Sequence, residues 1–455
     1  MKKYLLVLIC LFFLITRLYK IGEIPVSVYW DEASIGYNAY SIVETGKDEW
    51  GEVLPLHFRA FGEFKLPVYI YTTAISVKLF GLNEFSVRFP AVLFSLGVII
   101  LTFFLGKKFS GNTSVGLLSS FLLSISPWFF IFSRTGYEVT AGLMFYLLGI
   151  YLFLNYKKNT WFIFFSILSF ILSAYSYNSF RIIAPISIFI LIILYLKDLR
   201  RSILPIIFSA IILGASIIPI YRNYFLDNGA VRLKTVAASP SAYIKNYLSH
   251  FNPVFLFISG DTNLRSQQAG FGQLFIPEAL FLLLGFIFIC RKPKKNILLI
   301  VLALLAPIPA ALTRESPHAL RALSVVPFIS IISAIGASYF KKYYLIIILV
   351  FLTFFINYFA NFLSVYPLNS SEDWQYQYKK IYTDYGNEFE QYKRIIVSDK
   401  YAQPYIFALF YLKYDPDKFR QEVVRNSVDQ WGFSTVGKFG KFEFEKSDTL
   451  VSFIK

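Results

Sequence analysis

Residues 89–108 read FPAVLFSLGVIILTFFLGKK. Residues 89–106 form an apolar run long enough to cross a bilayer, and Lys107 and Lys108 follow it directly. Basic residues that flank a span lie preferentially on the cytoplasmic side. This stretch therefore predicts a membrane-spanning helix and the direction in which it runs, and the neighbouring segments can be assigned from it.

A second apolar segment, LPVYIYTTAISVKLFGL at residues 66–82, precedes this span and contains Lys78. If it also crossed the bilayer, Lys107 and Lys108 would lie outside, against the usual distribution of basic residues. We therefore expect residues 66–82 to lie along the outer interface of the membrane. They belong to a long first outer loop that covers residues 20–88.

The N-terminus resembles a signal sequence, with Lys2 and Lys3 before apolar residues 4–16. No small-residue cleavage site follows, so we interpret it as an uncleaved first helix with a cytoplasmic N-terminus. Further spans are predicted at residues 89–106, 113–132, 139–155, 160–177, 182–196, 203–220, 275–290, 296–312, 322–340 and 343–360. With these eleven spans every inner turn is basic, through Lys107, Lys108, Lys157, Lys158, Lys197, Arg200, Arg201, Arg291, Lys292, Lys294, Lys295, Lys341 and Lys342.

The composition agrees with a polytopic membrane protein. The chain has 455 residues, of which 56% are hydrophobic and 16% charged, and a soluble protein could not cover so much apolar surface. The formal charge of +16 could indicate a nucleic-acid partner, but the basic residues lie in short clusters between apolar runs, so we expect none. Cys10 and Cys290 lie in apolar segments and there are only three histidines, which argues against a disulfide framework and a multi-histidine metal site.

The chain changes character after the predicted transmembrane domain of residues 1–360. Residues 361–455 contain no apolar run of spanning length. Arg394–Ser398 and Phe442–Phe444 resemble strands, and residues 404–412 resemble a helix. Because the last span runs outward, these residues predict a small α/β domain outside the cytoplasm, on a multi-pass protein of the cell membrane.

Four predicted outer segments bring together acidic and basic residues. They are YWDE (Asp31, Glu32) and GEFKLP (Glu63, Lys65) in the first loop, SRTGYEVT (Arg134, Glu138), YSYNSFR (Tyr177, Arg181) and TRESPHALR (His318, Arg321). Carboxylates among cations suit chemistry on a phosphate-linked substrate, because arginine and lysine hold a phosphate and a carboxylate takes a proton from an attacking hydroxyl.

Each of these residues also has a structural interpretation. Asp31 and Glu32 could be ordinary loop charges, and Arg134 and Glu138 are four apart and could form a helical ion pair. Lys65 could extend along the interfacial helix. His318 fits a hydrogen-bonded interfacial residue better than a metal ligand, and the tyrosines fit an aromatic belt.

The ordered set of motifs resembles the GT-C glycosyltransferases. It consists of Trp30-Asp31-Glu32 after the first span, Lys65-Leu66-Pro67-Val68-Tyr69 before the interfacial helix, and Glu84-Phe-Ser-Val-Arg88-Phe-Pro at the second span. It is most similar to the protein O-mannosyltransferase and aminoarabinose transferase group, glycosyltransferase family 39 and its relatives, over residues 1–340. Two departures stand out: Leu66-Pro67 replaces two prolines, and the acid is Glu63 rather than the residue directly before Lys65.

The resemblance implies transfer of a sugar from a polyprenyl-phosphate donor lipid to a glycan, lipid or protein acceptor on the outer face of the membrane. Asp31 matches the acidic residue of the family's first loop that is taken as catalytic and is expected to act as the base, and Lys65, Arg134 and Arg321 are expected to hold the carrier phosphate. Glu32 and Glu138 would orient substrate or bind a divalent cation, which would be the cofactor. Glu63, Tyr69, Tyr177, Arg181 and His318 are expected to contact substrate.

Two other functions remain open at this point. A transporter or flippase for a lipid-linked glycan predicts buried acids within spans and broken helices in matched halves, whereas the predicted spans are nearly free of charge. A non-enzymatic assembly protein would use the outer domain for docking but would leave the basic outer turns unexplained.

Overall fold

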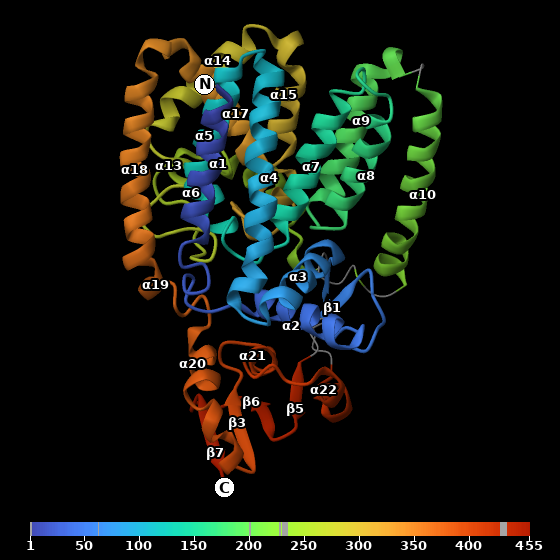
Figure 1. The fold of residues 1–455 in the computed structure, drawn as a ribbon, viewed down its shortest axis with the longest axis vertical. Helices are drawn as coiled ribbons and strands as arrows, with labels where there is room; N and C mark the ends of the chain where they lie inside the picture. The colour runs from blue at the N-terminus through green and yellow to red at the C-terminus, as the bar shows by residue number, and fades with distance from the viewer. Residues whose placement is uncertain (1, 62, 200–201, 227–228, 230–234, 428–434) are drawn as a thin grey trace.

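The computed structural model describes residues 2–61, 63–199, 202–226, 229, 235–427 and 435–455. Its long helices form one bundle, and a small sheet domain lies at one end of that bundle (Figure 1). The bundle contains α1 (Lys2–Leu18), α4 (Glu84–Ser110), α5 (Thr113–Ile125), α7 (Val139–Phe153), α8 (Phe162–Ala174), α9 (Phe180–Leu199), α10 (Ile203–Phe225), α14 (Glu278–Cys290), α15 (Pro293–Leu305), α17 (Val326–Ala337) and α18 (Tyr344–Ser364). Each of the eleven predicted spans coincides with one of these helices.

The lengths and apolar character of these helices fit a polytopic membrane protein. Among the described residues, five helical segments are long and apolar enough to cross a membrane: Glu84–Ser110, Phe180–Leu199, Ile203–Phe225, Pro293–Ala311 and Leu323–Ser364. The last has 42 residues and covers two predicted spans, with the 3-10 helix η3 (Ser338–Tyr343) between them. Five shorter apolar helices match other predicted spans. The predicted fold class is confirmed.

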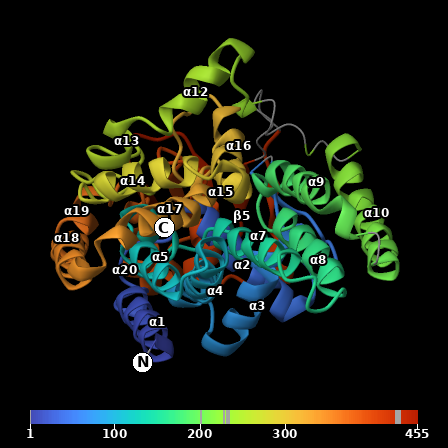
Figure 2. The same cartoon turned by 90° about the horizontal axis from the view of Figure 1, so that it is seen from above.

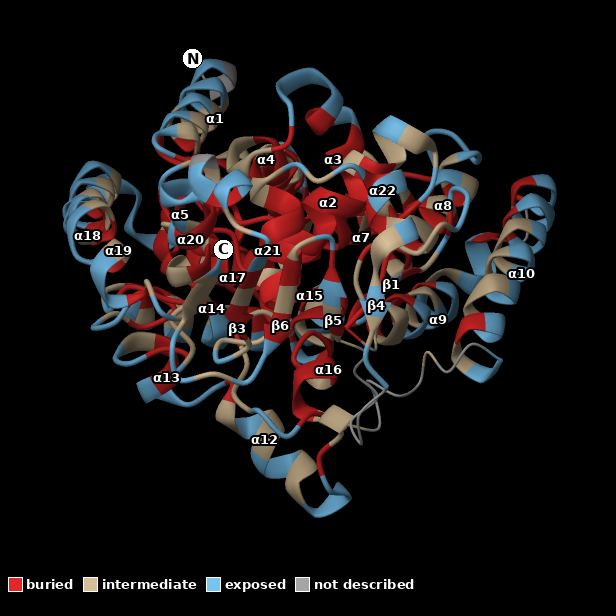
Figure 3. Cartoon of the chain, turned by 90° about the horizontal axis from the view of Figure 1, so that it is seen from below, coloured by how far each residue is buried: buried red, intermediate tan, exposed pale blue. Residues whose placement is uncertain are grey.

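Burial separates the centre of the bundle from its periphery. Helix α4 is central, since 61% of its most apolar 18-residue stretch is buried inside the protein. In α10 only 11% of the corresponding stretch is buried. Figure 2 shows α1, α10 and α18 at the outer edge of the bundle, and Figure 3 shows exposed residues along their sides. Helix α4 begins where the Asn83 side chain accepts a hydrogen bond from the Ser86 backbone N–H at 2.9 Å, and it ends at Gly111 in the left-handed conformation.

The two ends of the bundle differ as the charge pattern predicts. The N-terminus and the connection from α14 to α15 lie at the end away from the C-terminal domain (Figure 1). Three basic predicted inner turns, from the α4–α5, α14–α15 and α17–α18 connections, line one pocket at that end. Arg200 and Arg201 of a fourth turn lie outside the described residues.

The first outer loop is more structured than predicted. It contains helix α2 (Trp30–Thr45), the hairpin of β1 (Phe58–Ala60) and β2 (Glu63–Lys65), and helix α3 (Pro67–Phe80). Helices α2 and α3 lie at the end of the bundle, next to the C-terminal domain (Figure 1). Helix α3 has 14 residues, about 21 Å of helix, which is too short to cross a bilayer core of roughly 30 Å.

Shorter elements connect the long ones and shape their outer ends. They are α6 (Pro127–Phe132), η1 (Pro240–Ala242), α12 (Tyr243–Ser249), α13 (Pro253–Phe257), α16 (Ile308–Ala311) and η2 (Leu323–Val325). Helices α12 and α13 lie between the predicted spans 203–220 and 275–290.

The C-terminal domain contains a five-stranded sheet in the order β4-β5-β6-β3-β7. Strand β3 pairs parallel to β6 and antiparallel to β7. Its elements are α19 (Tyr366–Asn369), α20 (Tyr376–Asp384), η4 (Gly386–Gln391), β3 (Arg394–Ser398), α21 (Pro404–Tyr411), α22 (Pro416–Glu422), β4 (Val424–Arg425), β5 (Val436–Phe439), β6 (Phe442–Glu445) and β7 (Val451–Ile454). The two predicted strands and the predicted helix are therefore confirmed, while α18 extends past residue 360 to Ser364.

The C-terminal domain packs directly on α2. Phe410 of α21 and Val87 of α4 lie 2.6 and 2.7 Å from the position that a Cβ at Gly36 would occupy. A larger residue at this point of α2 would therefore displace neighbours on both sides. The Trp30 backbone N–H also donates to the Gln375 side chain at 3.1 Å. These contacts fix the start of α2 between the bundle and the C-terminal domain.

Candidate active site

A cavity of about 290 Å³ lies where the predicted outer segments meet. Its lining comes from the first loop, the α6–α7 and α8–α9 connections, the end of α10, and the segment after α16. Eight residues predicted from the sequence line it: Asp31, Glu63, Lys65, Glu138, Tyr177, Arg181, His318 and Arg321. Asp31 and Arg321, which are almost three hundred positions apart in the sequence, thus line the same cavity.

Lys65 and Asp31 form the closest charged contact in this cavity. Lys65 Nζ lies 2.5 Å from Asp31 Oδ1 and 3.4 Å from Glu63 Oε1. The lysine side chain is 5% exposed and Asp31 is 23% exposed. Burial acts to lower the Lys65 pKa, but Asp31, Glu63 and Glu138 outweigh burial and hold that pKa above its ordinary value. Lys65 is therefore a fully charged ammonium group with carboxylates on several sides.

Local structure explains why these two residues meet. Asp31 lies in the first turn of α2, where a carboxylate complements the helix dipole. The β1–β2 hairpin pairs Phe58 with Lys65, and Pro67 then starts α3 at its first position. The hairpin and the start of α3 therefore fix the lysine beside the start of α2.

Glu138 is a second acid at this cavity, immediately before α7. Burial raises its pKa to about 7. The positive charge of Lys65 opposes this effect, whereas the nearby carboxylates of Asp31 and Glu63 add to it. Asp31 and Glu138 therefore have different environments, and a carboxyl group with a pKa near neutrality can hold or release a proton under physiological conditions.

Arginine and histidine side chains also line the cavity. Arg321 donates to the Thr313 hydroxyl at 2.9 Å and lies 3.7 Å from Glu315, which is 78% exposed. Burial, together with Arg321 and His250, lowers the His318 pKa well below its ordinary value, so this imidazole is neutral. Arg181 contacts His57 at 3.1 Å. The cavity lining thus combines Lys65 and its carboxylate partners with two arginines, Arg181 and Arg321.

Three predicted site residues lie elsewhere. Arg134 is fully buried and donates to the backbone carbonyls of Thr16, Arg17, Tyr19 and Ile24 at 2.7–3.3 Å, against the prediction that it holds the carrier phosphate. The Tyr69 hydroxyl donates to the Val87 carbonyl at 2.8 Å and does not reach the cavity. Within the described residues no ion pair joins Arg134 to Glu138, so the alternative of a helical pair is also wrong.

Glu32 is the third, and its position corrects the role predicted for it. It is fully buried beside Arg88, whose Nη2 lies 3.0 Å from Glu32 Oε2. Its other oxygen accepts from Arg88 Nε at 3.1 Å and from the Gly136 backbone N–H at 2.5 Å. Both carboxylate oxygens of Glu32 are thus bonded within the protein, and Glu32 does not line the cavity.

The described residues contain no group of three or more His, Cys, Asp or Glu side chains placed to hold a metal ion. The predicted alternative of a cation bound by Glu32 and Glu138 also conflicts with the bonding of Glu32 to Arg88.

Two functional candidates were missed in the sequence. Arg88 belongs to the Glu84-Phe-Ser-Val-Arg88-Phe-Pro motif, but its partner Glu32 lies 56 residues away in the sequence. Arg265 lies between the predicted spans 203–220 and 275–290, and its guanidinium is 4.0 Å from the centre of the Tyr29 ring. Asp31 is among the charges that act on Arg265, so this arginine adds a cation near Asp31. Asp261 lies four residues before Arg265 in the sequence, and no sequence pattern links Arg265 to Asp31.

Comparisons with known proteins agree with this architecture. The structure is similar to ArnT from Cupriavidus metallidurans bound to undecaprenyl phosphate, with a TM-score of 0.52, 12% identity, and coverage of 73% of this chain and 60% of that chain. It is also similar to the Archaeoglobus fulgidus oligosaccharyltransferase, with a TM-score of 0.51, 13% identity, and coverage of 90% and 63%. The chain therefore has the GT-C fold of these two membrane enzymes.

A narrower match follows from the sequence. Residues 65–222 match the family described as dolichyl-phosphate-mannose-protein mannosyltransferase. A protein of Aquifex aeolicus described as uncharacterized is 28% identical over 158 residues, 34% of this chain and 30% of that protein. The predicted resemblance to the protein mannosyltransferase and aminoarabinose transferase group is thereby confirmed. The chain spans less than two thirds of the length of each of these relatives.

Proposed function

We propose that the protein transfers a sugar from a polyprenyl-phosphate donor to a hydroxyl group of an acceptor. The observation that carries this proposal is the contact of Lys65 with Asp31 in a cavity that Arg321 and Glu138 also line. Two similar structures add support: ArnT was solved with undecaprenyl phosphate, and the oligosaccharyltransferase AglB with a dolichol-phosphate and an inhibitory peptide.

The reaction needs a base and a phosphate-binding group in separate positions. The acceptor oxygen forms a bond to the anomeric carbon, and the bond from that carbon to the phosphate oxygen breaks. Asp31 takes the proton of the acceptor hydroxyl. Polyprenyl phosphate leaves with the bonding electron pair, and Lys65 and Arg321 stabilise its negative charge. A single in-line displacement inverts the anomeric centre.

Donor binding and the activation of Asp31 are coupled in this scheme. In the structure Lys65 Nζ is 2.5 Å from Asp31 Oδ1. A donor phosphate attracts the same ammonium group, which has three N–H donors. The phosphate therefore shares Lys65 with Asp31, and the carboxylate becomes available to the acceptor hydroxyl when the donor is in place.

The proposal places this cavity on the outer face of the cytoplasmic membrane. The basic turns at the opposite end of the bundle support a cytoplasmic N-terminus. The C-terminal domain lies at the same end as α2 and α3 (Figure 1). In this orientation it is extracytoplasmic and lies beside the entrance for a glycan, lipid or protein acceptor.

The test uses the purified full chain in sealed lipid vesicles with radiolabelled polyprenyl-phosphate sugars and a range of hydroxyl acceptors. The wild type should release polyprenyl phosphate and form a labelled product. Lys65→Gln should weaken donor binding and transfer by about tenfold or more, because a charge-assisted bond to phosphate contributes roughly 1.5–3 kcal/mol. Lys78→Gln is the matched control, since Lys78 is exposed on α3 and outside the cavity.

Movement of an intact donor across the bilayer without release of polyprenyl phosphate would contradict transfer and support the transporter alternative. Equal behaviour of the Lys65 and Lys78 variants would contradict the assignment of Lys65. Either result is read directly from the distribution of label between lipid, product and vesicle interior.

Glu138 should make the stability of the protein depend on pH. Its pKa is about 7 in the folded protein and has an ordinary value of 4.5, so between these values the folded state holds a proton that the unfolded state has lost. Stability should therefore fall as pH rises from about 5 to about 7, by up to roughly 3 kcal/mol. Glu138→Gln should remove this loss. Denaturation of both proteins across this range checks it, and a difference between them that is independent of pH would contradict it.

A further inference from the structure

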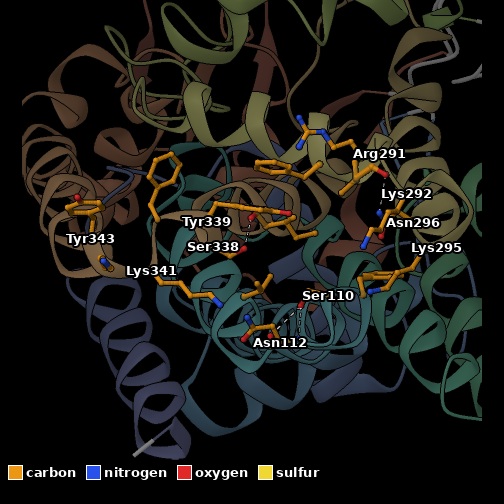
Figure 4. Close-up of a pocket in the computed structure, with 17 residues that line it drawn as sticks. Ser110, Asn112, Arg291, Lys292, Lys295, Asn296, Ser338, Tyr339, Lys341 and Tyr343 are labelled. Carbon is orange, nitrogen blue, oxygen red and sulfur yellow. Dashed lines mark hydrogen bonds between the residues drawn. The ribbon is translucent and has the colours of Figure 1, made fainter.

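A second pocket lies at the opposite end of the bundle from the candidate active site. Its volume is about 830 Å³. Three helix connections line it: α4–α5 through Ser110 and Asn112, α14–α15 through Arg291, Lys292 and Lys295, and α17–α18 through Lys341 and Lys342. Figure 4 shows Arg291, Lys292 and Lys295 on one side of this basic pocket and Lys341 on the other, with Ser110 and Asn112 between them.

The basic pocket concentrates positive charge that nothing in the described chain neutralises. Five of its lining residues are lysine or arginine and none is acidic. The ion pairs of the described residues do not include any of these five. The preference for basic residues on the cytoplasmic side explains their presence at this end. It does not explain why they converge on one hollow, where like charges repel.

Helix ends add to the positive potential. Helix α15 begins at Pro293, with Lys292 as its N-cap and Lys295 in its first turn. A positive side chain is unfavourable there because the N-terminus of a helix already carries partial positive charge. Helix α5 begins at Thr113 beside Asn112, which also lines the pocket. An anion bound between these two helix starts would relieve both effects.

Aromatic residues place the pocket at the membrane boundary. Tyr339 stacks on Phe288 with ring centres 3.6 Å apart, and the Arg291 guanidinium lies 5.3 Å from the Phe288 ring centre. Tyr339 is 62% exposed and Tyr343 is 55% exposed. Exposed tyrosines at helix ends are typical of the level of lipid headgroups. A ligand that combines a phosphate with acyl chains would meet the lysines and the apolar helix sides at once.

We propose that the basic pocket binds the headgroup of an acidic phospholipid of the cytoplasmic leaflet. Lysine and arginine beside a membrane attract anionic lipids, and here they come from three helix connections that one phosphate group can bridge. The bound lipid would stabilise the inner ends of α14, α15 and α17. This inference does not depend on sugar transfer at the other end of the bundle.

Native mass spectrometry of the full chain from detergent tests this proposal, with dioleoylphosphatidylglycerol and dioleoylphosphatidylcholine as probes. The wild type should retain one phosphatidylglycerol molecule more tightly than phosphatidylcholine. Lys292→Gln/Lys341→Gln should weaken the retention of phosphatidylglycerol by about tenfold or more. Lys292→Arg/Lys341→Arg keeps both charges and should restore it, which separates loss of charge from loss of structure.

The matched control is Lys107→Gln/Lys158→Gln, which removes the same charge at the same end of the bundle from exposed residues outside the pocket. Its lipid binding should equal that of the wild type. Equal weakening in both glutamine variants would overturn the proposal, because it would mean a diffuse surface effect. Displacement of the lipid by millimolar inorganic phosphate would also overturn it, because the pocket would then bind a free anion and not a headgroup.

Discussion

Asp31→Asn should lower the rate of sugar transfer by about 10³-fold while leaving donor binding nearly unchanged. An asparagine keeps the size of the side chain and can still accept a hydrogen bond from Lys65, which lies 2.5 Å from Asp31 in the wild type. It cannot take the proton of the attacking hydroxyl. Single-turnover kinetics with a labelled donor measure the rate, and equilibrium binding of the donor in nanodiscs measures the second quantity.

Glu63→Gln is the matched control for this prediction. It also removes one negative charge beside Lys65, but Glu63 lies farther from the ammonium group, at 3.4 Å. Its loss of rate should stay within about tenfold, since it removes one partner of Lys65 but no proton acceptor. Turnover of Asp31→Asn within a few-fold of the wild type would exclude Asp31 as the base. A loss of donor binding that accounts for the whole effect would instead assign Asp31 to positioning Lys65.

The end of the bundle at which each helix connection lies was predictable because its cause is local. Each predicted span is a continuous apolar run, and pairs such as Lys107-Lys108 and Lys341-Lys342 mark one end of it without reference to any distant residue. With the directions assigned, the residues that line the cavity had to lie at one end of the bundle. The cavity lining then includes Asp31, Lys65 and Arg321.

Helix α2 could not be predicted in the same way. Its sequence, WDEASIGYNAYSIVET, has no apolar stripe at helical spacing, because the helix is covered by the bundle on one side and by the C-terminal domain on the other. A periodic pattern arises only where one face of a helix meets solvent. The sequence motif therefore identified Asp31 but not the element that orients it.

The roles of buried arginines were equally hidden, because their partners are backbone carbonyls or distant acids. Arg134 was expected at the phosphate but bonds four carbonyl groups near the end of α1. No side-chain pattern marks a carbonyl as a partner. Charge at the end of a span thus predicted at which end of the bundle each residue lies, whereas the choice between a place at the cavity and internal bonding required the fold.

Arg88→Met should lower the free energy of unfolding by about 3–5 kcal/mol, because it leaves Glu32 as an unpaired buried charge. All five N–H groups of Arg88 are bonded. Nε donates to Glu32, Nη1 donates to the carbonyls of Ile21 and Pro25, and Nη2 donates to Glu32 and to the Ser27 carbonyl. The substitution therefore also leaves three buried carbonyls without a donor. Denaturation in detergent, followed by tryptophan fluorescence, measures the effect.

A double-mutant cycle with Glu32→Gln separates the pair from its surroundings. Each single substitution should be costly, and the double variant should cost clearly less than their sum, because neither buried charge remains. Arg59→Gln is the matched control: its pair with Glu52 joins side chains that are 49% and 46% exposed, so the cost should stay below about 1 kcal/mol. Strict additivity of the two substitutions would show that Glu32 and Arg88 act independently. Coupling would mean that the buried Glu32–Arg88 pair fixes the start of α2, which carries Asp31. Because the Gly136 backbone N–H also donates to Glu32, the same pair would fix the segment that carries Glu138. Asp31 and Glu138 would then be positioned together.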